Sequence, residues 1–294
     1  MQKQAFVNEC EVRFMRRMND LTDAIIKNPD ERVITLSGPT CSGKTIAARY
    51  ITRTVTRAGR HMLQVSIDDF YRSRELLIKE AEKQGTDPDF DSITSIDLPL
   101  LAETVRGIYE GRKVKLPVFD FVTGERTEYI PFDTSRVDVV LFEGIQAIYP
   151  EVTALLDGYP YLSVSINVRT ELIINGVEFT PRELRLMRRT VRDVRTRGTL
   201  PKDTFRLWET TVLPNEEKSI LPFEDSAKIK LDSTLAYEPN VIRDPLLETL
   251  AQHPVDGVYE ETARSLAERV AALAPIDPEY VPEESLYSEF LGRT

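Results

Sequence analysis

V-I-T-L-S-G-P-T-C-S-G-K-T, residues 33–45, is the stretch that decides the fold. Residues 33–36 are apolar or β-branched, which is typical of a short strand buried on both faces of a parallel sheet. Residues 46–50 continue in good helix formers, and Gly59 is a helix stop signal. The sequence therefore predicts a strand, a glycine-rich turn and a helix, in this order.

The turn is a complete G-x-x-x-x-G-K-T phosphate-binding loop. Its glycines allow backbone N–H groups to point at phosphate oxygens, at a helix N-terminus that favours anions. We expect Lys44 to contact the β- and γ-phosphates and the Thr45 hydroxyl to ligate Mg²⁺. A chance glycine-rich turn is the alternative, but the motif is complete and follows a strand. The predicted triphosphate-binding residues of the loop are Gly38, Pro39, Thr40, Cys41, Ser42, Gly43, Lys44 and Thr45.

The composition is that of an acidic protein. The 294 residues include 38 Lys and Arg against 48 Asp and Glu, a formal net charge of −10, which argues against a nucleic-acid partner. Two cysteines, Cys10 and Cys41, give no disulfide framework and favour a reducing compartment. No apolar signal core opens the chain, and no run approaches the ~18 apolar residues of a membrane span. We therefore expect a cytoplasmic protein without a membrane partner.

Apolar strand-like runs alternate with helical segments along the chain, which predicts a parallel sheet with helices on both faces. The expected strands are 33–36, 62–67, 137–142, 161–168 and 227–231, with a β-hairpin at 116–131 and a small β excursion around the turn 175–176. The expected helices are 5–27, 46–58, 73–84, 98–109, 181–198, one from 202, 241–252 and 259–273.

Two acidic residues follow predicted strands at the edge of the sheet where ligands bind. Asp68 lies where an acceptor hydroxyl would meet the γ-phosphate, and we interpret it as the base that accepts the hydroxyl proton, a role worth ~10²–10⁴ in rate. The alternative is a helix cap or a role behind Mg²⁺, and neighbouring Asp69 suits the cap better. Glu143 is predicted to hold Mg²⁺, directly or through water, rather than merely to start a helix.

The segment 181–198 is strongly basic. Its residues Arg185, Arg188, Arg189 and Arg192 recur at i, i+3, i+4 and i+7, on one face of a helix. Charge runs are usually solvated helix faces, but four arginines on one stripe repel one another unless an anion lies among them. Triphosphate is the anion we expect, and a helical lid of this kind would stabilise charge on the transferring phosphoryl group.

Together these motifs resemble the uridine kinase/phosphoribulokinase family of phosphate-loop kinases over roughly residues 32–235. S-I-D-D-F-Y (66–71) resembles the S-x-D-x-F-Y box, whose first Asp is the catalytic base, and F-E-G-I-Q-A-I-Y (142–149) resembles the box with the Mg²⁺-associated Glu. The basic run resembles the family's R-R-x-x-R-D-x-x-x-R-G lid. The resemblance implicates Arg189, Arg192 and Arg197 with the triphosphate and the acceptor, and Arg188 of the stripe is added to the predicted ATP-binding residues. The predicted catalytic set is Asp68, Lys44, Arg189 and Arg192.

The acceptor site is implied by the same resemblance. Asp91 matches the family residue that binds the ribose hydroxyls, and P-V-F-D-F (117–121) matches a hairpin that packs aromatic rings on the nucleobase. Gly124 stands where uridine kinases have the His that reads the pyrimidine, a change that relaxes or redirects specificity. The predicted acceptor-binding residues are Asp68, Tyr71, Asp91, Phe119, Phe121, Gly124 and Arg192.

The ending S-L-Y-S-E-F-L-G and the longer segment 169–182 resemble a bacterial uridine-kinase-like subgroup. The predicted fold is α/β, a P-loop NTPase fold with a parallel sheet, helices on both faces, and a small β-hairpin and helical lid over the acceptor site. We expect an N-terminal helix at 1–31, a P-loop kinase domain at 32–253, and a C-terminal helical extension at 254–294 packed on the core.

The resemblance predicts an ATP- and Mg²⁺-dependent kinase that phosphorylates a hydroxyl of a small molecule, in first place the 5′-OH of a uridine- or cytidine-like nucleoside. One alternative is a kinase for a sugar phosphate, a polyol or a pantothenate-like alcohol. The other is a nucleotide-dependent switch or binding module. The absence of an N-K-x-D guanine box and the presence of an acid on the acceptor side argue against it. A small-molecule acceptor is the expected partner, and the sequence leaves a homo-oligomer open.

Overall fold

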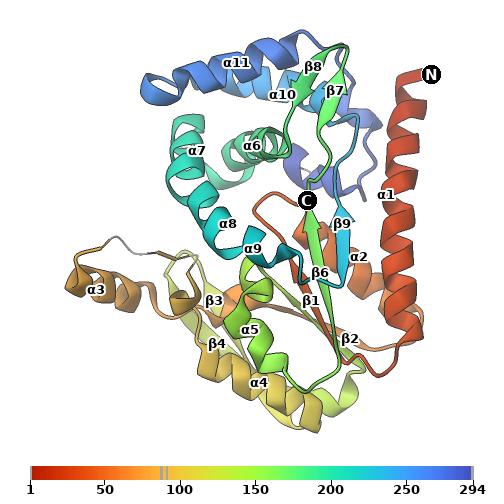
Figure 1. Cartoon of the computed structure of the whole chain (residues 1–294), viewed down its shortest axis with the longest axis vertical. Coiled ribbons are helices and arrows are strands. Elements are labelled where there is room, and N and C mark those ends of the chain that lie inside the picture. The colour runs from red at the N-terminus through yellow and green to blue at the C-terminus, as the bar shows by residue number, and fades with distance from the viewer. Residues whose placement is uncertain (1, 87–88, 91, 293–294) are drawn as a thin grey trace.

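The computed structural model describes residues 2–86, 89–90 and 92–292. Its centre is a five-stranded sheet in the order β2-β5-β1-β6-β9, with every neighbouring pair parallel (Figure 1). The strands are β1 (Val33–Ser37), β2 (Met62–Ser66), β5 (Val139–Glu143), β6 (Tyr161–Asn167) and β9 (Ile229–Asp232).

Two hydrophobic clusters cover the two faces of this sheet. Because successive strand residues point to opposite faces, Ile34 and Leu36 of β1 belong to one cluster, whereas Val33 belongs to the other. The first cluster contains residues of α1 (Gln2–Lys27), α2 (Lys44–Arg57), α6 (Pro181–Arg192), α10 (Glu238–Gln252) and α11 (Glu260–Ala271). The second contains residues of α4 (Leu98–Glu110) and α5 (Pro150–Thr153). The predicted parallel sheet with helices on both faces is therefore confirmed.

Further short elements lie outside the central sheet. They are α3 (Arg74–Gln84), α7 (Pro201–Leu207), α8 (Leu213–Ser219), α9 (Leu221–Glu224), the hairpin of β3 (Lys113–Asp120) and β4 (Glu125–Asp133), and the hairpin of β7 (Leu172–Ile174) and β8 (Val177–Phe179). Both hairpins were expected from their turns. The α-helix expected over 181–198 is shorter in the structure. α6 ends at Arg192, and residues 193–197 form a wider π-helical turn.

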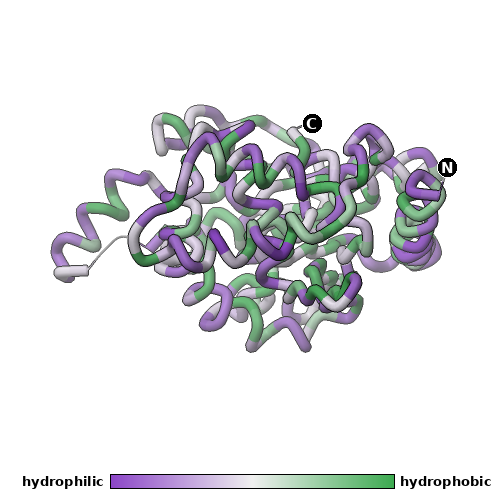
Figure 2. The backbone as a smooth tube through the Cα atoms, turned by 90° about the horizontal axis from the view of Figure 1, so that it is seen from above, coloured by the Kyte–Doolittle hydropathy of each residue, from purple (hydrophilic) through white to green (hydrophobic). Residues whose placement is uncertain are grey.

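The two ends of the chain pack on the same core. In Figure 2 the long N-terminal helix alternates between hydrophilic and hydrophobic residues, as an amphipathic helix does. Its buried face shares one cluster with residues from α11 and from the 3-10 segment Leu286–Leu291. The division into three parts stays a prediction. None of the described helices combines the length and the apolar character that crossing a bilayer requires.

Candidate active site

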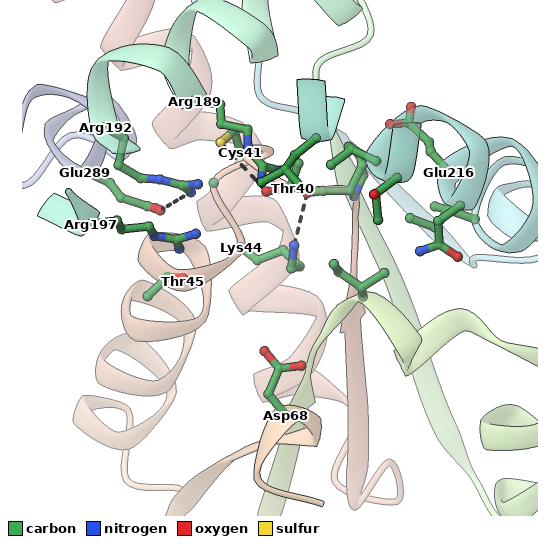
Figure 3. A pocket seen from close by; sticks show the side chains of 18 of the residues that line it. Thr40, Cys41, Lys44, Thr45, Asp68, Arg189, Arg192, Arg197, Glu216 and Glu289 are labelled. Carbon is green, nitrogen blue, oxygen red and sulfur yellow. Dashed lines mark hydrogen bonds and ion pairs between the residues drawn. The ribbon is translucent and has the colours of Figure 1, made fainter. Parts of the chain in front are cut away.

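A cavity of about 830 Å³ lies over the phosphate-binding loop, at the carboxyl edge of the sheet. Figure 3 shows that side chains from the loop, α2, the lid and the turn after β2 face it. It brings together most of the predicted site residues: Pro39, Thr40, Cys41, Gly43, Lys44, Thr45, Asp68, Tyr71, Phe121, Glu143, Arg189, Arg192 and Arg197. The residues not among those lining it are Gly38, Ser42, Phe119, Gly124 and Arg188. Asp91 lies outside the described residues.

The loop geometry explains its glycines. A Cβ atom on Gly38 would lie 2.0 Å from the backbone oxygen of Ile166, so no larger residue fits against β6. Gly43 has a φ of 92°, in the left-handed region that favours glycine. The ammonium of Lys44 donates to the carbonyl oxygens of Gly38 and Pro39, at 2.7 and 3.0 Å. The sequence therefore folds into a turn that aims the first backbone N–H groups of α2 at the cavity.

Two carboxylates meet at this edge because their strands are neighbours. Ser66, the last residue of β2, is paired in register with Glu143, the last residue of β5. Asp68 follows in the 3-10 turn Ile67–Phe70, and its carboxylate points toward Lys44 across the cavity (Figure 3). Burial lowers the pKa of Lys44, whereas the charges of Glu143 and Asp68 act in the opposite direction. The site therefore contains a cation and two acids within mutual electrostatic reach.

Asp69 does not have the helix-capping role that the sequence suggested. Its Oδ1 accepts a hydrogen bond of 3.1 Å from the backbone N–H of Phe119, in β3. Burial raises the pKa of Asp69, and the hydrogen bond from Phe119 acts against this. Asp69 thus ties the β3–β4 hairpin to the turn that carries Asp68, which fixes the hairpin over the cavity.

Three lid arginines converge on Asp193, an acid whose side chain is 2% exposed. Its carboxylate lies 3.1 Å from Nε of Arg189, 2.8 Å from Nη2 of Arg192 and 3.8 Å from Nε of Arg197. The π-helical turn at 193–197 allows Arg197 to lie near the other two. These three guanidinium groups therefore surround one buried carboxylate, and the three arginines line the cavity, as Figure 3 shows.

The other two arginines of the stripe correct the sequence-based interpretation. Arg185 and Arg188 are 1% and 0% exposed, and the anions that balance them are carboxylates of the chain itself. Arg185 binds Glu216, with both contacts at 2.6 Å, and Arg188 binds Glu238. Arg188 also donates to the backbone oxygen of Cys41, at 3.0 Å. In this structure Arg188 supports the phosphate-binding loop from the core side, and its assignment to ATP stays a prediction.

Aromatic side chains gather at the cavity where the sequence predicts the acceptor. The rings of Tyr71 and Phe121 lie 6.2 Å apart, and that of Phe119 lies 5.6 Å from Tyr71 and 5.1 Å from Phe121. Phe121 is 55% exposed and lines the cavity, whereas Phe119 is buried beside it. Such edge-to-face contacts hold the rings in defined orientations.

Gly124 lies at the turn of the hairpin, with a φ of 75°. A Cβ atom there would lie 2.7 Å from Cβ of Arg74. Arg74 packs across the glycine and donates to the backbone oxygen of Phe121, at 2.6 Å. Arg74 therefore occupies the space beside Gly124, and the acceptor contact of Gly124 stays a prediction.

Several residues that line the cavity carried no motif in the sequence. They are Val122, Leu207, Thr211, Val212, Asn215, Glu216, Ile220 and Glu289, whereas Ile145, which also lines it, belongs to the box at 142–149 and was given no role. Those between 207 and 216 belong to helical segments of ordinary composition and Ile220 to the turn that follows α8, so no local signal marked them. Glu289 belongs to the S-L-Y-S-E-F-L-G ending, which was noticed as a resemblance and given no role.

The donor set around the loop fits Mg²⁺. Among the described residues no group of three or more His, Cys, Asp or Glu could hold a metal ion on its own. Mg²⁺ at a nucleotide needs no such group, because it takes one or two protein oxygens and completes its shell with phosphate oxygens and water. The Thr45 hydroxyl and the Glu143 carboxylate, both facing the cavity, supply that number.

Comparisons with known proteins agree with this geometry. The family model of the Phosphoribulokinase / Uridine kinase family matches residues 33–236. A uridine kinase of Ureaplasma urealyticum is 29% identical over 201 residues, covering 68% of this chain and 86% of the relative. Uridine-cytidine kinase 2-B of Danio rerio is 31% identical over 202 residues, covering 67% and 71%. A structure described as a fructose transport system kinase from Silicibacter sp. TM1040 has a TM-score of 0.55 at 18% identity, covers 72% of this chain and 98% of that one, and supports the fold alone.

Proposed function

Because the chain belongs to the phosphoribulokinase/uridine kinase family and is an ATP-dependent P-loop phosphotransferase, we propose that it phosphorylates the 5′-OH of a pyrimidine-like nucleoside. The observation that carries this proposal is the position of Asp68. Its carboxylate points toward Lys44 across the cavity, which the exposed ring of Phe121 also lines. A hydroxyl held at the aromatic side would therefore lie between a proton acceptor and the phosphate-binding loop.

The loop and the lid would bind the triphosphate. Backbone N–H groups at the start of α2 would donate hydrogen bonds to the phosphate oxygens, and Lys44 would exchange its two carbonyl partners for phosphate oxygens. Asp193 holds Arg189 and Arg192 in place by hydrogen bonds, with Arg197 close by, so little reorganisation of the first two is needed when charge develops on the transferring group. Mg²⁺ bound through Thr45 and Glu143 would neutralise charge on the β- and γ-phosphates.

Asp68 would accept the proton of the acceptor hydroxyl as the new O–P bond forms. The acceptor would stack on Phe121, with Tyr71 and Phe119 fixing the orientation of that ring. From the family resemblance, Asp91 is the residue we propose for the ribose hydroxyls. Asp97 is not proposed for this role, because both oxygens of its carboxylate already have partners. One oxygen caps α4 by accepting a hydrogen bond from the backbone N–H of Leu100, and the other pairs with Arg126 of the hairpin.

One observation favours a second candidate acceptor class. Where uridine kinases read the pyrimidine with a histidine, this chain has Gly124 covered by the cationic side chain of Arg74. A site rejects a wrong base when that base leaves a polar group of the site without a hydrogen bond. Without the histidine, the hairpin loses this means of discriminating between bases. A sugar phosphate or another polyol therefore remains the alternative acceptor.

Release of ADP from ATP tests the proposal directly. Purified protein would be assayed with Mg²⁺ and a panel of uridine, cytidine, purine nucleosides, nucleoside monophosphates, sugar phosphates, polyols and pantothenate. Stimulation by a pyrimidine nucleoside, with the 5′-monophosphate as product, supports the proposal. Stimulation only by a non-nucleoside supports the second candidate, and hydrolysis that no acceptor stimulates would indicate a nucleotide switch instead.

A further inference from the structure

The C-terminal segment Leu286–Leu291 packs directly against the phosphate-binding loop, although it lies far beyond the residues 33–236 that the family model matches. The side chain of Leu286 covers Gly43, where a Cβ atom would lie 2.3 Å from its Cδ1. At the other end of the segment, the backbone oxygen of Leu291 accepts a hydrogen bond of 2.8 Å from Arg195, in the lid. The segment therefore connects the loop with the lid.

The segment is firmly anchored. Tyr287 and Phe290 are both 0% exposed, and their ring centroids lie 5.6 and 4.9 Å from the guanidinium carbon of Arg188. Just before them, the hydroxyl of Ser285 donates to the carboxylate of Glu11 in α1, at 2.7 Å. Aromatic burial and a buried hydrogen bond hold the backbone on both sides of position 289. The Glu289 side chain is therefore delivered to one place by a fixed backbone.

That place is the cavity over the phosphate-binding loop, which Glu289 lines together with Lys44, Thr45 and Arg192 (Figure 3). Its Oε1 lies 3.6 Å from Nη1 of Arg192, which is an ion pair too long for a hydrogen bond. Its Oε2 is buried and has no hydrogen-bond partner among the described residues. A mostly buried carboxylate with one oxygen that lacks a hydrogen bond lowers the stability of the fold, so a structural role alone does not explain it.

Two effects of Glu289 on Arg192 have to be compared. The first is orientation, and it is small, because Asp193 already binds Nε and Nη2 of Arg192 at 3.1 and 2.8 Å. The second is charge, since an anion bound to the same guanidinium would lie close to the Glu289 carboxylate. At a separation of roughly 6 Å and an effective dielectric constant of about 20, a like charge weakens binding about a hundredfold before salt screening. The charge effect therefore dominates.

We propose that Glu289 is a specificity-determining residue of the nucleotide site, which competes with nucleotide phosphates for Arg192. Its carboxylate neutralises the lid when no phosphate is bound and weakens the binding of phosphate-bearing nucleotides. The consequence is faster release of ADP, the product that leaves from this end of the cavity. The inference rests on the proposed nucleotide site, but not on the identity of the acceptor.

The test is the affinity of purified protein for ADP and for adenosine, measured by calorimetry at low and high salt. Glu289→Gln keeps the shape of the side chain and removes its charge. We expect it to tighten ADP binding about tenfold at ~0.1 M salt, less at higher salt, and to leave adenosine binding unchanged. A structural role would change the affinities for both ligands together.

The C-terminal segment offers a matched control. Glu284 lies just before it, is mostly exposed and pairs with Arg53 on the surface, so Glu284→Gln should leave both affinities unchanged. Glu289→Asp retains the charge and should stay close to the wild type, and Glu289→Ser replaces the Gln variant if that one is unstable. Unchanged or weaker ADP binding by the charge-free variants would overturn the inference. If wild-type protein binds no nucleotide, the proposed function itself fails.

Discussion

Replacement of Arg188 by Met removes a fully buried cation from the joint between the lid and the phosphate-binding loop. In the structure its guanidinium binds Glu238 and donates to two backbone oxygens, those of Cys41 at 3.0 Å and Ser233 at 2.9 Å. Met has a similar length and is apolar, so the substitution leaves little empty volume. What it leaves behind is a buried carboxylate that keeps only the hydrogen bond from the backbone N–H of Leu235, at 2.7 Å, and two carbonyl groups that lose the Arg188 donor.

The expected cost is about 3–5 kcal/mol of unfolding free energy, the usual loss when one partner of a buried ion pair is removed. Burial already raises the pKa of Glu238 against the charge of Arg188. Without that charge the carboxyl would protonate more readily, which places the loss toward the lower end of the range. For a chain of this size the loss corresponds to a fall in Tm of roughly 6–15 °C.

Urea denaturation and thermal melting measure this loss, and calorimetric titration with ADP at 15 °C measures binding by the folded variant. Arg182→Met is the matched control, since Arg182 on the same helix pairs with Glu217 at the surface and should change stability by less than about 1 kcal/mol. The double variant with Arg188→Met and Glu238→Met should recover most of the loss, because both buried charges are then absent.

The opposite pattern would refute the reasoning. If Arg188→Met melted like the wild type and lost ADP binding by more than tenfold, Arg188 would be a phosphate ligand, as the sequence pattern first suggested. The buried ion pairs would then be a poor description of the lid in its working form.

Three further predictions concern the core, the hairpin and the acceptor. Burial raises the pKa of Glu11, so the folded protein loses stability as pH rises through that pKa. Glu11→Gln removes this loss, so in parallel thermal melts it should raise Tm relative to the wild type by about 2–4 °C at pH 8 and by less at pH 5. Gly124→Ala should cost about 1–2 kcal/mol in urea denaturation, because of the positive φ and the contact with Arg74. Phe121→Ala should raise the acceptor KM about tenfold or more and leave the Kd for ADP unchanged, because stacking on a base contributes about 1–3 kcal/mol. An unchanged acceptor KM would show that the ring is not part of the acceptor site.

The sequence predicts the parts of the site that are contiguous along the chain. The phosphate-binding loop, Asp68 and Glu143 each end or follow an apolar strand, and parallel strands bring their carboxyl ends to one edge. Chain order and strand hydrophobicity are therefore enough to place them near one another. The β3–β4 hairpin follows in the same way from its local turn chemistry.

The pairing of the lid arginines could not be predicted in this way. Helical periodicity places four arginines on one face, but it does not say whether that face meets a ligand or the core. The partners of Arg185 and Arg188 lie 31 and 50 residues away, at Glu216 and Glu238, and no motif links them. Glu289 is still further from Arg192, and its place in the cavity depends on how the C-terminal segment folds back.

The central claim is that Asp68 accepts the acceptor's proton beside a triphosphate held by the loop. Steady-state turnover of Asp68→Asn with the best acceptor, alongside its Kd for ADP, tests this claim most directly. We predict a kcat lower by about a hundredfold or more with a Kd within about twofold of the wild type. A variant that turns over at the wild-type rate would contradict the account.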